Sequence, residues 1–360
     1  MIFKKGGQNR KHLKFTYHGN ELEIVNKFTY LGVIFTTGGS FSATYDALSG
    51  QALKALFKLK SNLVKFTNIS VSHSLELFDK LIEPILNYGC EVWGLNNSIQ
   101  IERIHLRYCK QVLGVRTQTQ NNFIYGELGR YPLINKRIVC VLKYWIKILQ
   151  SDDVKYIKIV YNMLVHDLEM YPENNSWVKS VKHLLNTLGF GDAWFFQGVG
   201  DVNCFISIVK QRTSDIYVQN WITELQQTTR GKNYCIYGIF RFQPYLNVVN
   251  ISKLRFEFTR LRVSAHRLEV EAGRWHKPEK TPYENRKCKH CNVLEDEFHF
   301  LLECPVFNSL RKQYIRRYYW NRTNMIKFIE LLQTDNAKTI KNLATFIFNA
   351  AKLRTELYYQ

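Results

Sequence analysis

The chain has 360 residues, of which 46% are hydrophobic and 14% aromatic. This composition excludes a disordered tail and is enough for two or three domains with cores of their own. There are 50 Lys and Arg against 30 Asp and Glu, a net charge of +20. The excess predicts a polyanionic partner, because Lys and Arg contacts with phosphates release counterions.

No apolar run reaches the length of a transmembrane helix, and the first residues lack the apolar stretch of a signal peptide. We therefore expect no membrane partner. Of the eight cysteines, three fall in one cluster and the other five are scattered and odd in number. This usage favours a reducing, intracellular setting, in the cytoplasm or the nucleus, over a disulfide framework.

Residues 1–37 have the composition of strands. Lys14–Tyr17 and Leu22–Val25 flank a turn, and Phe28–Phe35 follows, rich in β-branched and aromatic residues and closed by two glycines. Apolar residues then recur at helical spacing from Ala47 to Leu63. Four lysines lie largely off this apolar stripe: Lys54, Lys58, Lys60 and Lys65.

Most of the remaining chain is predicted to be helical. Tyr125–Leu133, with two glycines and Pro132, predicts a turn-rich connection, and the adjacent Asp152 and Asp153 are expected to cap a helix. Between 171 and 245 the pattern is broken by glycines and supports only a helix near Val202–Leu225. The predicted helices are Ser72–Gly89 with a kink at Pro84, Ser98–Leu113, Asn135–Gln150, Val154–Leu168, Met325–Leu332 and Ala337–Leu357.

Cys288, Cys291, His299 and Cys304 form a Cys-x2-Cys-x7-His-x4-Cys pattern. Three thiolates and one imidazole make a closed tetrahedral set for a structural zinc ion, and the spacing lies within the range of known zinc ligands. His290, between the first two cysteines, is a competing ligand that the spacing disfavours. The alternative is four buried or idle side chains that bind no metal.

The stretch Leu294–Glu303 predicts a short helix that ends at Cys304, because Pro305 forces the preceding residue out of helical geometry. This helix end is needed if His299 and Cys304 are to bind the same ion. Residues five apart on a continuous α-helix differ by about 140° around its axis, too much to share one ion easily.

After the cysteine cluster, Arg311–Lys327 carries six Lys or Arg, no acidic residue and several aromatic residues. Basic residues interleaved with rings suit single strands, whose bases stack on the rings while the cations take the phosphates. The alternative is an amphipathic helix whose aromatic residues belong to the core. The candidate contacts in this segment are Arg316, Arg317 and Tyr318.

Several further segments follow one another in a recognisable order: Phe28–Val33, Ala47–Lys65, Leu81–Gly94, Gly126–Leu133 with Tyr144 and Trp145, and Arg260–Arg274 followed by the cysteine cluster. In this order they resemble the C-terminal part of the reverse transcriptase of LINE-type (non-LTR) retrotransposons. The resemblance implies the hairpin after the polymerase palm, then the thumb, the connecting region and the C-terminal zinc segment. Only the tract 171–245 is weakly covered.

The resemblance also implies site residues. Tyr30, Leu31 and Gly32 correspond to the hairpin that grips the primer end. The lysines of the thumb-like helix, Lys54, Lys58 and Lys60, are candidates for contacts with the primer–template backbone. Arg262 and Arg267, in the basic segment before the cysteine cluster, are further nucleic-acid candidates, and His266 between them either touches phosphate or is buried.

The expected fold is mainly α (α+β), with a small N-terminal β element, a helical body and a small C-terminal zinc subdomain. Five segments are expected: a palm-terminal hairpin (1–40), a thumb-like domain (41–115), a connection (116–250), a basic segment with the zinc module (251–310) and C-terminal helices (311–360).

The catalytic carboxylates of that family lie upstream of the hairpin, and Asp152 and Asp153 do not replace them. We therefore expect no polymerase activity from this chain alone, but binding of RNA or an RNA–DNA hybrid. Two alternatives remain: a protein-interaction scaffold stapled by zinc, and part of an active polymerase whose palm and fingers are supplied upstream or in trans. A zinc hydrolase that uses Glu295, Asp296 or Glu297 is disfavoured, because three thiolates and an imidazole fill the zinc shell.

Overall fold

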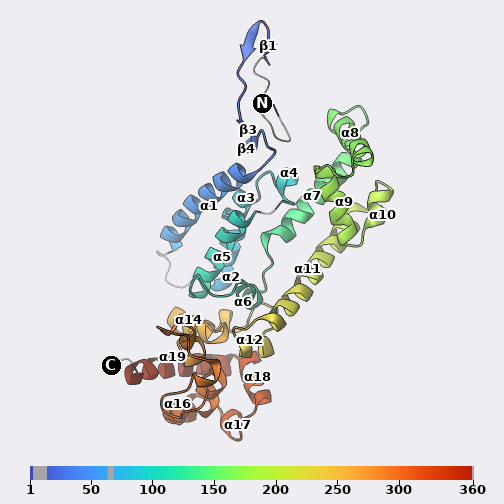
Figure 1. Ribbon diagram of the computed structural model, residues 1–360. Coiled ribbons are helices and arrows are strands. Elements are labelled where there is room, and N and C mark those ends of the chain that lie inside the picture. The colour runs from blue at the N-terminus through green and yellow to red at the C-terminus, as the bar shows by residue number, and fades with distance from the viewer. Residues whose placement is uncertain (3–13, 64–68, 97, 359–360) are drawn as a thin grey trace. The chain divides into compact units, whose positions relative to one another are not determined.

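The computed structural model describes residues 1–2, 14–63, 69–96 and 98–358 (Figure 1). It is mainly helical with two small antiparallel sheets near the N-terminus, which confirms the predicted fold class. The chain forms two compact units. Unit 1 comprises Met1–Leu63, Phe78–His105 and Pro132–Asp215, and unit 2 comprises Val64–Leu77, Leu106–Tyr131 and Ile216–Gln360. The finer division into five segments stays a prediction.

Both sheets of unit 1 are two-stranded hairpins. β1 (Phe15–Tyr17) pairs with β2 (Asn20–Leu22), and β3 (Lys27–Tyr30) pairs with β4 (Val33–Thr36). The run Phe28–Phe35 is thus divided by a two-residue turn, in which Leu31 and Gly32 both have positive φ, 45° and 81°. The hydroxyl of Tyr88 donates to the carbonyl of Leu31 at 2.9 Å and holds this turn.

Helix α1 (Ser42–Leu63) follows the second hairpin and is joined to it by Thr44, whose hydroxyl bonds both the N–H and the carbonyl of Ile34. One face of α1 is buried and carries Leu48, Ala52, Leu56 and Leu59. The prediction that the lysines lie off this face is confirmed for Lys54, Lys58 and Lys60, which are exposed. Lys65 lies outside the described residues.

The helix predicted over Ser72–Gly89 with a kink at Pro84 is instead two helices, interrupted at Ile82. Helix α2 (Val71–Leu81) ends before Ile82, and α3 (Glu83–Leu86) begins with Pro84 in its first turn, where the missing N–H costs nothing. The other helices wholly in unit 1 are α4 (Cys90–Trp93), α7 (Leu133–Leu149), α8 (Tyr156–Met170), α9 (Trp177–Thr187) and α10 (Gly191–Phe195). Helices α2, α5 (Ile99–Leu113) and α11 (Val202–Gln227) contain unit boundaries.

The prediction that Asp152 and Asp153 cap a helix is wrong. The residue at the N-cap of α8 is Lys155, with no side-chain cap bond. The carboxylate of Asp152 instead lies 3.2 Å from the Lys155 ammonium, in an exposed ion pair.

The prediction of a turn-rich connection at Tyr125–Leu133 is also wrong over its first half, which belongs to α6 (Asn121–Leu128) in unit 2. Gly126 lies inside this helix. The position requires glycine because a Cβ there would come within 2.6 Å of both the Trp221 ring and the Tyr234 hydroxyl. Gly129 ends the helix in a left-handed conformation with φ +56°. The glycines therefore serve close packing and a C-cap.

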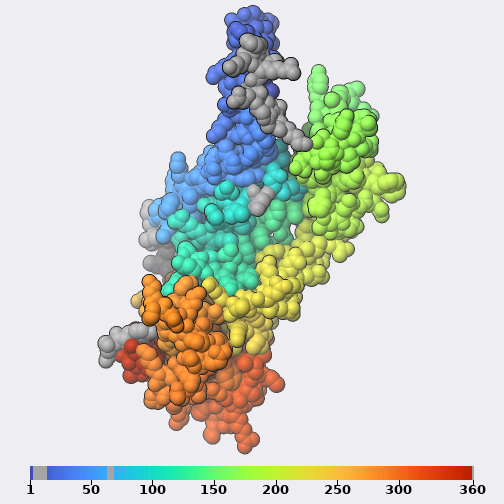
Figure 2. Space-filling model, viewed as in Figure 1, coloured from blue at the N-terminus to red at the C-terminus, as the bar shows by residue number. Residues whose placement is uncertain are grey.

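Unit 2 is built around α19 (Ala337–Tyr358), which packs against α13, α14 and α16 and buries Leu343, Phe346 and Ile347. Figure 2 shows the chain from about residue 251 onward, orange through red, packed together as one body. The other helices of unit 2 are α12 (Lys232–Tyr237), α13 (Tyr245–Val248), α14 (Ser252–Arg262), α15 (Glu269–Ala272), α16 (Asn308–Tyr314), α17 (Arg317–Trp320) and α18 (Met325–Gln333). Short turns complete it: η1 (Gly273–Trp275), η2 (Tyr283–Asn285), η3 (His299–Glu303) and η4 (Pro305–Phe307).

A buried ion pair joins α6 to α14. The Arg262 guanidinium donates to both Glu127 carboxylate oxygens, at 2.8 and 2.9 Å, and to the Leu332 carbonyl at 2.6 Å. The two side chains are only 1% and 0% exposed. Burial alone would lower the pKa of Arg262, but the facing carboxylate raises it. Arg262 is therefore a core residue, which corrects its assignment as a nucleic-acid contact.

Replacing Glu127 with Ala should lower the free energy of unfolding by roughly 3–5 kcal/mol, because it leaves the Arg262 charge buried without a partner. Urea unfolding followed by circular dichroism measures the change. The matched control is Asp335→Ala, which breaks the exposed pair with Arg241 and should cost about 0–1 kcal/mol. Equal losses for the two variants would contradict the role of the buried pair.

Candidate metal centre

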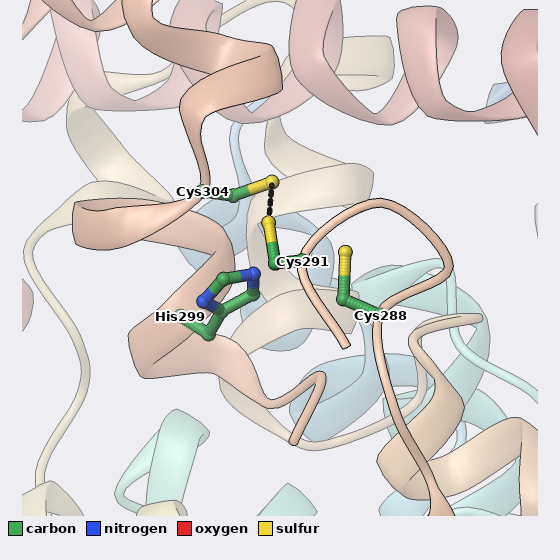
Figure 3. A group of neighbouring side chains, drawn as sticks. All are labelled: Cys288, Cys291, His299 and Cys304. Carbon is green, nitrogen blue, oxygen red and sulfur yellow. Dashed lines mark hydrogen bonds between the residues drawn. The ribbon is translucent and has the colours of Figure 1, made fainter. Parts of the chain in front are cut away.

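The structure brings Cys288, Cys291, His299 and Cys304 together in unit 2 (Figure 3). One ligand atom from each lies within 4.8 Å of the others. These are the four residues that the spacing singled out, and the cluster does not include His290, whose side chain is exposed.

A tight turn presents the first two cysteines. The segment is closed by a bridge between Lys287 and Leu294, and the N–H of Cys288 donates to the Val293 carbonyl at 2.8 Å. Asn292 takes a positive φ of 57°, which a short polar residue tolerates. The turn folds back on itself, and both thiols face the cluster (Figure 3).

A widened helical turn presents the other two ligands. The predicted helix begins at Glu297 rather than Leu294, and from His299 to Glu303 its hydrogen bonds span five residues instead of four. The N–H of Cys304 donates to the His299 carbonyl at 2.9 Å. A turn of this width brings residues five apart closer around the axis than an α-turn does. His299 and Cys304 therefore reach one point although no α-helix would align them.

The chain leaves the helix at Cys304, as predicted. This residue has ψ 119°, outside helical geometry, and Pro305 follows it. The helix end is held by Arg311, whose guanidinium donates to the carbonyls of Leu301 at 2.9 Å and Cys304 at 2.8 Å. Arg311 is buried, so it does not belong to an exposed basic surface. The structural role of Arg311 could not be predicted from its place in a basic stretch of the sequence.

The cluster is buried and lacks internal partners for its imidazole. His299 is 4% exposed, and neither ring nitrogen has a hydrogen-bond partner among the described residues. The nearest carboxylate oxygen, of Glu303, is 3.6 Å from Nδ1. A buried imidazole without partners is rare in proteins, and a metal ion would satisfy it.

The thiols have different surroundings. Burial raises the pKa of the Cys304 thiol to about 12. Burial also acts to raise the pKa of Cys288, but hydrogen bonds from the Tyr358 hydroxyl and from the N–H groups of Cys291 and His290 lower it overall. The sulfurs of Cys291 and Cys304 lie 3.8 Å apart. Three thiols and one imidazole at this distance fit a soft or borderline metal ion, which binds thiolates and would offset their charge.

The carboxylate of Glu297, close to the cluster in sequence, is buried and hydrogen-bonded to residues outside it. Glu297 accepts hydrogen bonds from Asn233 at 2.6 Å, Ser264 at 2.8 Å and His266 at 2.8 Å. Burial would raise the pKa of Glu297, but the charge of His266 lowers it to about 2. His266 is thus a buried partner of a carboxylate and not a phosphate contact.

Glu295 forms the second buried carboxylate pair of this region. Its oxygens accept from Arg354 at 2.7 and 2.6 Å, and also from the Glu269 N–H at 2.7 Å. Through these hydrogen bonds Glu295 and Glu297 anchor the cysteine segment to α19 and to the loop after α14.

The other predicted contact residues lie on surfaces. Lys54, Lys58 and Lys60 are exposed on α1 of unit 1, and Arg267, Arg316, Arg317 and Tyr318 are exposed in unit 2. The aromatic residues of the last segment are divided: Tyr319 is buried, whereas Tyr318 is exposed and lies below the Lys327 ammonium at 4.9 Å from the ring centroid. Tyr30 and Leu31 are exposed at the hairpin turn. Their roles in binding remain predictions.

No family model, curated protein or solved structure matches this chain. In the part of the chain that the structure describes, every helix is too short or too polar to cross a lipid bilayer. The resemblance to LINE-type reverse transcriptases therefore rests on the sequence segments alone.

Purified protein should contain one metal ion per chain, and Cys304→Ala should lose it and unfold the segment around residues 286–304. Elemental analysis and limited proteolysis report the two effects. Two controls separate the cluster from its surroundings: Cys204→Ala, at an exposed cysteine outside it, and His290→Ala should both retain the metal. Loss of metal from His290→Ala but not from His299→Ala would contradict the ligand set.

Proposed function

We propose that this chain binds nucleic acid through basic surfaces and that the Cys3His cluster holds a structural zinc ion. The observation that carries the proposal is where the charge lies. Among the described residues, seven basic and six acidic side chains are buried, so the core removes charges of both signs almost equally. Burial of the described residues therefore does not offset the net charge of +20 that the whole sequence carries.

Zinc is the metal that the donor set favours. Thiolates and imidazole suit zinc better than they suit magnesium or calcium, which prefer oxygen ligands. Four protein ligands leave no position for a substrate, so the ion would act as a staple for the segment around it. Cys288 and Cys291 on one side and His299 and Cys304 on the other would be joined through the ion.

We further propose that the chain corresponds to the thumb, connection and zinc segment of a LINE-type reverse transcriptase, and that it binds RNA or an RNA–DNA hybrid without catalysing polymerisation. The order of the segments supports this assignment. It is also consistent with the hairpin turn at Leu31 and Gly32 and with the exposure of the α1 lysines, which a contact with nucleic acid requires.

A second candidate function is assembly with another polypeptide, such as one carrying the palm and fingers, or use as a protein-interaction scaffold. The observation that favours it is uncovered apolar surface in unit 1. The side chains concerned are Phe15, Tyr17, Phe28 and Tyr30 on the hairpins and Tyr156, Val160 and Met163 on α8, each at least 47% exposed.

Wild-type protein should bind a structured RNA at 50 mM salt, with affinity that falls steeply as salt rises. Replacing Arg316 and Arg317 with Ser should weaken binding and reduce the slope of log K against log salt by about 2, since each lost phosphate contact removes roughly one unit. Fluorescence anisotropy titrations at four salt concentrations give both values.

The matched control is the double variant Lys253→Ser and Lys341→Ser, which removes the same charge from two exposed positions elsewhere in unit 2. It should change the slope less. Absence of RNA binding by the wild type at 50 mM salt would refute the proposed function, and an unchanged slope in the arginine variant would remove these two residues from the interface.

A further inference from the structure

Two neighbouring hollows in unit 2 share the side chains of Arg116 and Arg267. The first has a volume of about 560 Å³ and lies between α14 and α19. The second has a volume of about 660 Å³ and reaches from the loop before α6 to Trp275. Because the same two arginines line both, the hollows are adjacent and the two side chains lie where they meet. We call the two hollows together the Arg116–Arg267 groove.

The two arginines at the middle carry uncompensated charge. Both are exposed, and neither guanidinium has an ion pair or hydrogen bond to any described residue. The other charged groups of the groove are largely paired. Arg260 bonds to Glu257 and to the Gly114 carbonyl, and Glu271 lies 3.0 Å from Arg274. The net effect is a site for an anion at the point where the hollows meet.

An exposed aromatic ring borders the second hollow. Trp275 is 63% exposed, and the guanidinium of Arg230 lies 5.6 Å from its ring centroid. The backbone beside it is fixed, since the N–H of Thr281 donates to the Gly273 carbonyl at 2.9 Å and a Cβ on Gly273 would meet the Arg286 side chain at 2.8 Å. The indole of Trp275 therefore lies on a turn whose backbone is hydrogen-bonded, with the Arg230 guanidinium beside it.

We propose that the Arg116–Arg267 groove binds single-stranded nucleic acid. Arg116 and Arg267 hold backbone phosphates, and Trp275 stacks on one base. A ring beside unpaired guanidinium groups matches the way proteins bind single strands, where each base offers a π-face and the backbone offers charge. A duplex does not expose its base faces, and a simple anion would not use the indole. Each hollow has the volume of a ligand site large enough for a nucleotide.

This inference rests on the proposed nucleic-acid function and specifies its site. The test uses full-length, zinc-loaded protein and two fluorescent probes, a 12-nucleotide single-stranded RNA of mixed sequence and a 12-base-pair RNA duplex. The variants are Trp275→Ala, Trp275→Phe and the double change Arg116→Ser with Arg267→Ser. The controls are Tyr156→Ala, at an exposed ring in unit 1, and the Lys253→Ser, Lys341→Ser pair.

Trp275→Ala should weaken single-strand binding by about 10-fold or more and duplex binding by no more than about two-fold, since only the single strand stacks on the ring. Trp275→Phe should keep most of the affinity. The double arginine change should weaken single-strand binding and lower its salt slope by about 2. Zinc content and thermal unfolding measured on every variant exclude a loss caused by misfolding.

Different results separate the two claims. If the wild type binds neither probe, the proposed function fails and the groove with it. If the wild type binds but Trp275→Ala behaves like Tyr156→Ala, or loses duplex and single-strand affinity equally, the groove is not the binding site and the broader function stands.

Discussion

The pair between Glu127 and Arg262 is the interaction on which unit 2 most depends. Its two charged groups are fully removed from water, and such groups are tolerated only when each is paired and hydrogen-bonded. The Glu127 carboxylate meets two guanidinium nitrogens and the Tyr245 hydroxyl, and the guanidinium also reaches the Leu332 carbonyl. One pair thereby fixes α6, α13, α14 and α18 against one another, including residues 135 positions apart in the chain.

The cysteine cluster is positioned by the same kind of interaction. Glu295 lies between the turn that carries Cys288 and Cys291 and the helix that carries His299, and Glu297 begins that helix. Their buried bonds to Arg354, Asn233 and Ser264 attach this segment to α19, α12 and the end of α14. A metal ion would then join the two sides of a segment whose carboxylates are already bonded to the rest of unit 2. The widened turn from His299 to Glu303 completes it by bringing two side chains together that an α-helix would keep apart.

The sequence predicted the features that are local. The four cluster residues lie in one short segment, so their spacing alone was informative, and periodicity located most helices. The sequence did not predict features that depend on residues far apart in the chain. The charge of Arg262 cannot reveal a carboxylate 135 residues away, and Gly126 resembles a loop glycine until Trp221 is placed against it. The width of the turn at His299 was likewise hidden, because hydrogen bonds and not residue types define it.

Two classes of arginine follow from these contacts, and they bear on where a polyanion would bind. Arg262, Arg311 and Arg354 lie in the core and donate to carboxylates or carbonyls, so their charges serve the fold. Arg116 and Arg267 line hollows, and neither forms an ion pair with an acidic group among the described residues. A basic stretch in the sequence mixes the two classes, as the contrast between buried Arg262 and exposed Arg267 shows. The contacts of each guanidinium, and not its place in a basic stretch, distinguish the two classes. By this criterion the Arg116–Arg267 groove is a better candidate for a polyanion site than the longest run of positive charge.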